Sequence, residues 1–188
     1  MKTALLHRYP VDRIKETNSA FPYLRDKGID VLTFKSFDRL SNKMKFWKSL
    51  AWIFYAPFLV LGKGYDVIYC DDSYPFYPAL VKLVSPRSKV ILRIGDFHLM
   101  YYYSGLTYKI LHFLEKISWH LADEIIAISL PMAFKIRSET NTPVWAVFDP
   151  VEPLDFIPDP AQKPDQKIVM FHGVLTKNKN VEILLRAA

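Results

Sequence analysis

The sequence predicts an α/β protein built on a doubly wound parallel sheet. Short apolar runs alternate with helical stretches along a chain of 188 residues, and 51% of the residues are hydrophobic. The runs are continuously apolar, which is typical of strands buried on both faces of a sheet. Right-handed crossovers through the intervening helices then give a Rossmann-like domain, which we expect over residues 1–148.

Each element is predicted from its local pattern. The strands are expected, as short mostly apolar runs, over residues 3–6, 30–34, 66–70, 89–94, 124–128 and 144–147. The helices between them are expected over residues 11–27, 41–61, 77–84, 107–121 and 130–139. Gly28 marks the end of the first helix. The helix over 107–121 has apolar residues at a period near 3.6, which is the clearest helical signal in the chain.

A proline-rich segment follows the predicted sheet. Each proline in residues 149–166 restricts the backbone and removes a hydrogen-bond donor, so we expect a semi-rigid hinge or linker there. Residues 167–188 then begin a new strand and part of a helix. Such a short piece cannot bury its apolar faces alone. We expect it to be the start of a second Rossmann-like domain, or a piece that packs back onto the first.

The composition indicates which binding partners and which cellular compartment suit the chain. The chain has 25 Lys and Arg against 19 Asp and Glu, a net charge of +6, so its surface attracts anions. Nucleic acid is disfavoured as a partner because no binding motif is present and the positive charge is scattered. The single cysteine, Cys70, excludes an internal disulfide and a Cys-rich zinc site and favours a reducing, cytoplasmic location. The longest apolar run, residues 50–61, is shorter than the roughly 20 residues that span a bilayer.

Four segments carry a family resemblance in chain order. Tyr65-Asp66-Val67-Ile68-Tyr69-Cys70 and Lys89-Val90-Ile91-Leu92-Arg93-Ile94-Gly95-Asp96 are two strands with their following loops. Leu121-Ala122-Asp123-Glu124-Ile125-Ile126-Ala127-Ile128-Ser129, with Leu114-Glu115-Lys116 before it, is the most specific segment, and residues 169–188 are the last. Together they resemble the GT-B glycosyltransferases of the family 4 type over nearly the whole chain. The resemblance implies an acceptor-side domain, a hinge and the start of a donor-side domain.

The resemblance also implies a reaction and a set of site residues. The enzyme would transfer a sugar from a nucleotide-sugar donor to a glycan or lipid-linked acceptor, with retention of configuration and with no metal or other cofactor. Positive charge and helix N-termini stabilise the leaving diphosphate in such a reaction, and open α/β sheets bind ligands in the loops after their central strands. The expected roles are catalysis by Asp96 and His98, binding of the donor diphosphate by Lys179, Gly173 and Arg13, and binding of the acceptor by Tyr101 and Tyr102.

The chain departs from the family pattern at two places that bind phosphate. Val174 stands where the family has an arginine, and the segment from Pro10 to Lys15 lacks the family's pair of glycines. We expect residues 1–188 alone to be inactive, because most of the donor pocket would follow Ala188. The alternative is a non-catalytic, membrane-associated acceptor-side subunit that needs a separate donor-side partner chain.

Several other residues have competing interpretations. Residues 43–58 combine lysines with aromatic side chains, which is typical either of a peripheral membrane contact or of a core helix with lysines at its exposed end. Asp96 could instead cap a helix. The adjacent Asp71 and Asp72 are interpreted as a turn cap, and His7 as a structural or surface residue.

Overall fold

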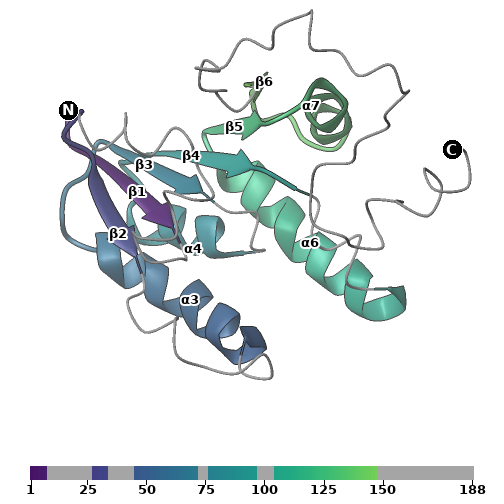
Figure 1. Cartoon of the computed structure of the whole chain (residues 1–188), viewed down its shortest axis with the longest axis horizontal. Coiled ribbons are helices and arrows are strands. Elements are labelled where there is room, and N and C mark those ends of the chain that lie inside the picture. Colours follow the sequence, from purple (N-terminus) through teal and green to yellow (C-terminus); the bar gives the residue numbers. More distant parts are fainter. Residues whose placement is uncertain (8–26, 34–44, 72–75, 97–103, 148–188) are drawn as a thin grey trace, which may run out of the picture. The chain divides into compact units, whose positions relative to one another are not determined.

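Six strands form one sheet in the computed structural model, and every neighbouring pair of strands is parallel (Figure 1). The strands are β1 (Thr3–His7), β2 (Asp30–Thr33), β3 (Val67–Asp71), β4 (Lys89–Ile94), β5 (Glu124–Ala127) and β6 (Val144–Ala146). The structure describes residues 1–7, 27–33, 45–71, 76–96 and 104–147. The parallel sheet confirms the predicted α/β, Rossmann-like fold class.

Four helices lie in the described part of the chain. They are α3 (Lys45–Val60), α4 (Tyr77–Val84), α6 (Gly105–Leu121) and α7 (Leu130–Arg137). The limits of α4 and β4 are those predicted, and the other described elements differ from the prediction by a few residues at their ends. The predicted helix over 11–27 lies almost wholly outside the described residues. Gly28, which was predicted to end it, has φ of 70°, the left-handed conformation that glycine adopts most easily.

The order of the strands reverses once. The sheet reads β2-β1-β3-β4-β5-β6, so the chain steps from β1 to β2 in one direction and then adds β3 to β6 in the other. A reversal of this kind defines the switch point of a doubly wound sheet, where loops diverge at the carboxyl ends of the two central strands. Here the switch point lies between β1 and β3.

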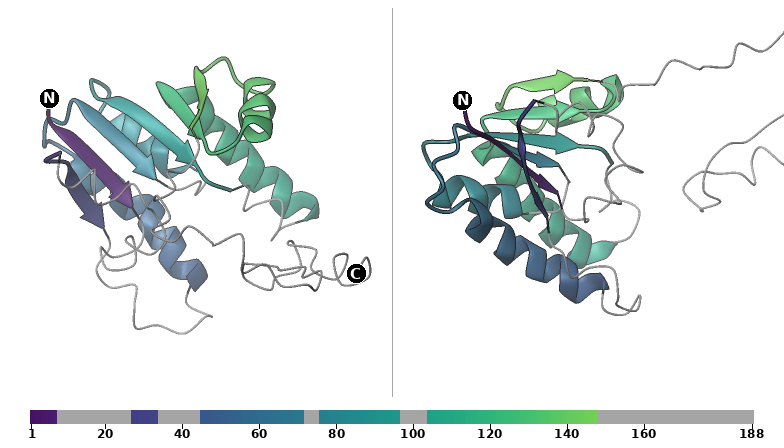
Figure 2. Two further views of the ribbon diagram at one scale, coloured as in Figure 1. Left: turned by 45° about the horizontal axis from the view of Figure 1, so that its top comes forward. Right: turned by 60° about the vertical axis from the view of Figure 1, so that its left-hand side comes forward.

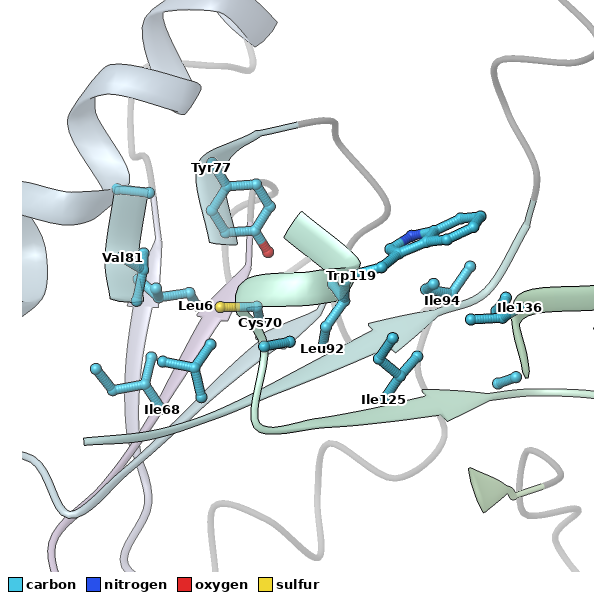
Figure 3. Packing of buried hydrophobic residues seen from close by; sticks show 14 of the residues in the cluster. Leu6, Ile68, Cys70, Tyr77, Val81, Leu92, Ile94, Trp119, Ile125 and Ile136 are labelled. Atoms are coloured by element: carbon cyan, nitrogen blue, oxygen red, sulfur yellow. The ribbon is translucent and has the colours of Figure 1, made fainter. Parts of the chain in front are cut away.

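The main core lies between one face of the sheet and all four described helices. Figures 1 and 2 show α3, α4 and α6 along the same side of the sheet. Figure 3 shows how side chains from strands and helices meet in this layer. Removing such side chains from water supplies most of the stability of the fold, at roughly 1.5–3 kcal/mol for each large one. The fully buried large residues are Trp52, Trp119, Tyr77, Leu5, Leu6, Ile68, Leu92, Ile94, Ile125 and Ile136, and of these only Leu5 lies in a separate cluster.

The amino ends of the strands are tied together by polar side chains. Asp123, just before β5, accepts hydrogen bonds from the backbone N–H of Val90 at 2.7 Å and from Lys82 Nζ of α4 at 2.7 Å. Ser88 Oγ donates to the carbonyl oxygen of Tyr65 at 2.6 Å. These contacts fix α4, β4 and β5 to one another at the edge of the sheet opposite to the switch point.

The chain divides into two compact units, Met1–Val151 and Glu152–Ala188. All the described residues belong to the first unit, so the predicted hinge over 149–166 and the start of a second domain over 167–188 lie outside them. Among the described residues, no helix has the length and the apolar character needed to cross a membrane.

Candidate functional site

A single row of side chains crosses the sheet near the carboxyl ends of its strands. Residues directly opposite in a parallel pair point to the same face of the sheet. The register pairs His7 with Asp71, Asp71 with Arg93 and Arg93 with Ile126, and it continues to the outermost strands. The row faces away from the main core, because Leu6, Cys70 and Leu92, the neighbours of its central members along the chain, point into that core. The full row is Thr33, His7, Asp71, Arg93, Ile126 and Trp145.

The three central members of the row form a charged group, which we call the strand-end cluster: His7, Asp71 and Arg93. Arg93 Nη1 donates to Asp71 Oδ1 at 2.7 Å, the length of a strong charge-assisted hydrogen bond. His7 Nε2 lies 3.5 Å from Asp71 Oδ2, which is close enough for an ion pair whenever the imidazole is protonated. One carboxylate therefore holds an imidazole and a guanidinium in place on opposite sides.

The strand-end cluster is largely withdrawn from water. Asp71 is 3% exposed and His7 is 7% exposed. Removing one partner of a buried pair leaves the other charge without compensation, so the three side chains depend on one another. They lie at β1, β3 and β4, which means that the cluster sits at the switch point itself.

Asp96 is the one predicted site residue that the structure describes. It follows Gly95 directly after β4, at the same edge of the sheet as the strand-end cluster, and it is half-buried. The other predicted residues lie outside the described part of the chain, so the structure does not bring the predicted set together. Those residues are Arg13, His98, Tyr101, Tyr102, Gly173 and Lys179.

The strand-end cluster is not among the predicted sites. The predicted structural or surface role of His7 agrees with its burial, whereas Asp71, predicted as a turn cap, is the last residue of β3 and accepts a hydrogen bond from Arg93. A signal was available, because Arg93 is a charged residue that follows three apolar ones inside a central strand. A charge in that position needs a partner of opposite sign, and Asp71 ends the strand next to it.

Backbone strain accompanies the loop after β3. Phe76, which precedes the first turn of α4, has φ of 79° and is the only residue other than glycine with a positive φ in the described part of the chain. A bulky side chain in this conformation costs about 1–3 kcal/mol, and such strain often marks a functional loop. Because α4 follows β3, this strained residue lies on the carboxyl side of the strand that carries Asp71.

A second group of titratable residues lies on α6 and after α7. Glu115, 4% exposed, has Oε2 3.2 Å from His112 Nδ1, while His112 Nε2 lies 3.3 Å from Glu139 Oε2. Burial, and then the negative charge of Glu139, raise the pKa of Glu115 to about 8. Burial raises the pKa of Glu139 too, but hydrogen bonds and charges from Lys116 and Lys135 outweigh it and lower that pKa. This group joins α6 to the end of α7.

The chemistry of the site is that of fixed charge. Among the described residues, no three His, Cys, Asp or Glu side chains gather closely enough to hold a metal ion. The carboxyl edge instead offers a carboxylate at Asp96 and, beside the switch point, a guanidinium and an imidazole fixed by Asp71. Such preorganised groups set the electrostatic potential at this edge of the sheet without having to rearrange.

No protein-family model matches the chain, and no curated protein matches it either. A Rossmann-like sheet hosts many unrelated activities, so the fold alone does not define this one. The function is therefore inferred from the residues at the carboxyl edge.

Proposed function

We propose that this chain is the acceptor-side part of a glycosyltransferase of the GT-B type, which transfers a sugar from a nucleotide-sugar donor to an acceptor. The observation that carries the proposal is the place of Asp96. It lies two residues after the central strand β4 at the carboxyl edge, next to the switch point between β1 and β3 where doubly wound sheets bind ligands. This strand and its loop also form one of the segments that resemble the family.

In this proposal Asp96 accepts a hydrogen bond from a sugar hydroxyl and orients the reacting sugar. The strand-end cluster supplies fixed charge at the same edge of the sheet, because Asp71 holds Arg93 and His7 in place there. His98 faces the reacting sugar beside Asp96, and Tyr101 and Tyr102 contact the acceptor. Lys179, Gly173 and Arg13 neutralise and enclose the donor diphosphate.

The test measures release of the nucleoside diphosphate from a panel of nucleotide sugars by the gene product purified from its source cell, with extracted glycans and lipids as acceptors. We expect Asp96→Asn to lower kcat/KM by about 100-fold, because a fixed polar contact to the reacting sugar is lost. The matched control is Asp66→Asn. Asp66 also adjoins a central strand, but it is exposed and lies at the amino edge, where it accepts from the backbone N–H of Lys2.

The outcomes separate the alternatives. Turnover that falls equally in both variants would contradict a role for Asp96 at the reacting sugar. Acceptor binding without turnover, with turnover restored by a separate donor-side chain, would favour the non-catalytic subunit instead. No binding of any donor or acceptor would overturn the proposal.

A further inference from the structure

The helices that cover the main core are also apolar on their outer side. Large apolar side chains are exposed on α3, α4 and α6, and Phe58, Phe113 and Leu106 are 68%, 63% and 74% exposed. These three helices lie on the same side of the sheet, with α4 in contact with both α3 and α6 (Figures 1 and 2). We call the set the outer helical surface; it comprises Phe54, Phe58, Leu61, Leu83, Leu106, Ile110 and Phe113.

The outer side of α3 shows the pattern most clearly. Trp52, Ala56 and Val60 are buried against the core, whereas Phe54 and Phe58 lie on the exposed side, one helical turn apart. A helix that covers one face of a sheet normally places polar residues on its outer side. The exposed phenylalanines of α3 do nothing for the core, which indicates that they contact something else.

The charges of the three helices point to the kind of partner. The sequences of α3, α4 and α6 contain one acidic residue, Glu115, and it is buried. Basic residues accompany the apolar ones: Lys109 is exposed on α6, and Lys63 is exposed just after α3, followed by exposed Asp66, which accepts from the backbone N–H of Lys2. An apolar surface whose helices carry an exposed lysine and whose one acidic residue is buried complements a membrane with negatively charged headgroups.

We propose that the outer helical surface docks on an anionic lipid bilayer. The phenylalanines and leucines enter the boundary between headgroups and acyl chains, and Lys63 and Lys109 lie at the level of the phosphates. The three helices would lie along the membrane, since their exposed apolar side chains are on the side of each helix that faces away from the sheet. The face of the sheet that carries the strand-end cluster then points away from the lipid, because the helices cover the other face. This inference stands on the exposed residues and does not depend on the proposed transferase activity.

The experiment is flotation of the full 188-residue chain with vesicles of phosphatidylcholine alone and of phosphatidylcholine mixed with phosphatidylglycerol. We expect binding to the mixed vesicles and a loss of that binding at high salt, because salt screens the lysines. Phe58→Ser combined with Phe113→Ser should weaken binding at least tenfold, an order of magnitude set by the apolar area lost. Both side chains are exposed, so circular dichroism should show an unchanged fold.

The matched control is Phe134→Ser on α7. Phe134 is 60% exposed, as Phe58 and Phe113 are, but it lies outside the outer helical surface. The variant Phe134→Ser should leave vesicle binding unchanged. Equal binding by the double variant and the wild-type chain would overturn the proposal. So would a wild-type dimer that the double variant loses, in the absence of vesicle binding, since the surface would then contact a second copy.

Discussion

Asp71 holds two basic side chains at the carboxyl edge, and its removal tests how far they depend on it. We expect Asp71→Asn to lower the free energy of unfolding by about 2–3 kcal/mol, because the partly buried guanidinium of Arg93 loses its counter-charge. Urea unfolding at neutral pH measures the change. A double variant with Arg93→Met should recover part of the loss, because it removes the uncompensated charge. A double variant less stable than Asp71→Asn would contradict the coupling.

Glu115 makes stability depend on pH. Its pKa is raised from 4.5 to about 8 in the folded chain, mainly by burial and then by the charge of Glu139. The folded state therefore keeps a proton that the unfolded chain loses. The stabilisation that this proton contributes is fully present below about pH 4.5, the pKa in the unfolded chain. It is lost as the pH rises through the folded pKa of about 8. The variant Glu115→Gln cannot ionise, so we expect its stability relative to wild type to grow over this window, by about 4 kcal/mol between pH 4.5 and pH 8.

Glu139 provides the control for Glu115, because its pKa is shifted in the opposite direction. The pKa of Glu139 is lowered, because Lys116 and Lys135 outweigh its burial. Its stabilising effect is present at neutral pH and is lost as the pH falls through its folded pKa. Glu139→Gln should therefore be less stable than wild type at neutral pH and approach it in acid. Denaturant unfolding of both variants from about pH 2 to pH 8 distinguishes the two directions, because the change for Glu139 falls below pH 4.5 and the change for Glu115 above it. Parallel curves would contradict both assignments.

At the scale of elements, the start of α7 depends on one side chain. Ser129 lies just before the helix, and its hydroxyl accepts from the backbone N–H of Met132 at 3.4 Å. We expect Ser129→Ala to lower the free energy of unfolding by about 0.5–1 kcal/mol, because a helix N-cap is lost. Ser138→Ala at the other end of α7 is the control. Ser138 Oγ donates to the carbonyl oxygen of Lys135 in an exposed position, and its loss should cost less than about 0.5 kcal/mol.

The described strands and helices could be predicted because their signals are local. β4 is a short run of mostly apolar residues, and α4 begins with Pro at its second position and ends before a turn, so their limits match the prediction. The residues of the segment from Leu121 to Ser129 also have local and structural tasks: Asp123 ties strand ends together, and Ser129 caps α7. This most specific segment of the family resemblance therefore supports the fold more directly than the chemistry.

The strand-end cluster could not be predicted in the same way. His7, Asp71 and Arg93 come together only through the order and register of three strands that are far apart in the sequence. A shift of one residue in any of these strands would turn its side chain to the other face of the sheet. The sequence of each strand contains a histidine, an aspartate or an arginine, but the contacts among them depend on how the strands pair.

At the scale of the whole molecule, Cys70 reports on the opening of the sheet. It is the single cysteine of the chain and is fully buried in β3, where the ring of Tyr77 lies close to it (Figure 3). Burial raises the pKa of its thiol, an effect that the hydrogen bond with Tyr77 only partly offsets. We expect labelling by a thiol reagent to be slowed at least 1,000-fold, on the order of the equilibrium constant for unfolding of a stable domain.

The free energy of opening derived from Cys70 labelling should equal that of global unfolding by urea, since β3 is central and has a neighbour on each side. The control is labelling in concentrated urea, where the rate should match that of a free thiol. Labelling much faster than global unfolding allows would contradict the view that β3 opens only when the whole sheet does.

The strand order also bears on how the sheet is assembled as the chain is synthesised. β1 is made before the other five strands, yet in the folded sheet it lies between β2 and β3. The hydrogen bond between Lys2 and Asp66 joins residues that are 64 positions apart. The centre of the sheet therefore forms only after a long loop has closed, which is the slow and entropically costly step. From β3 onward each new strand pairs with the one made just before it, so the sheet extends from β3 to β6 in the order of translation.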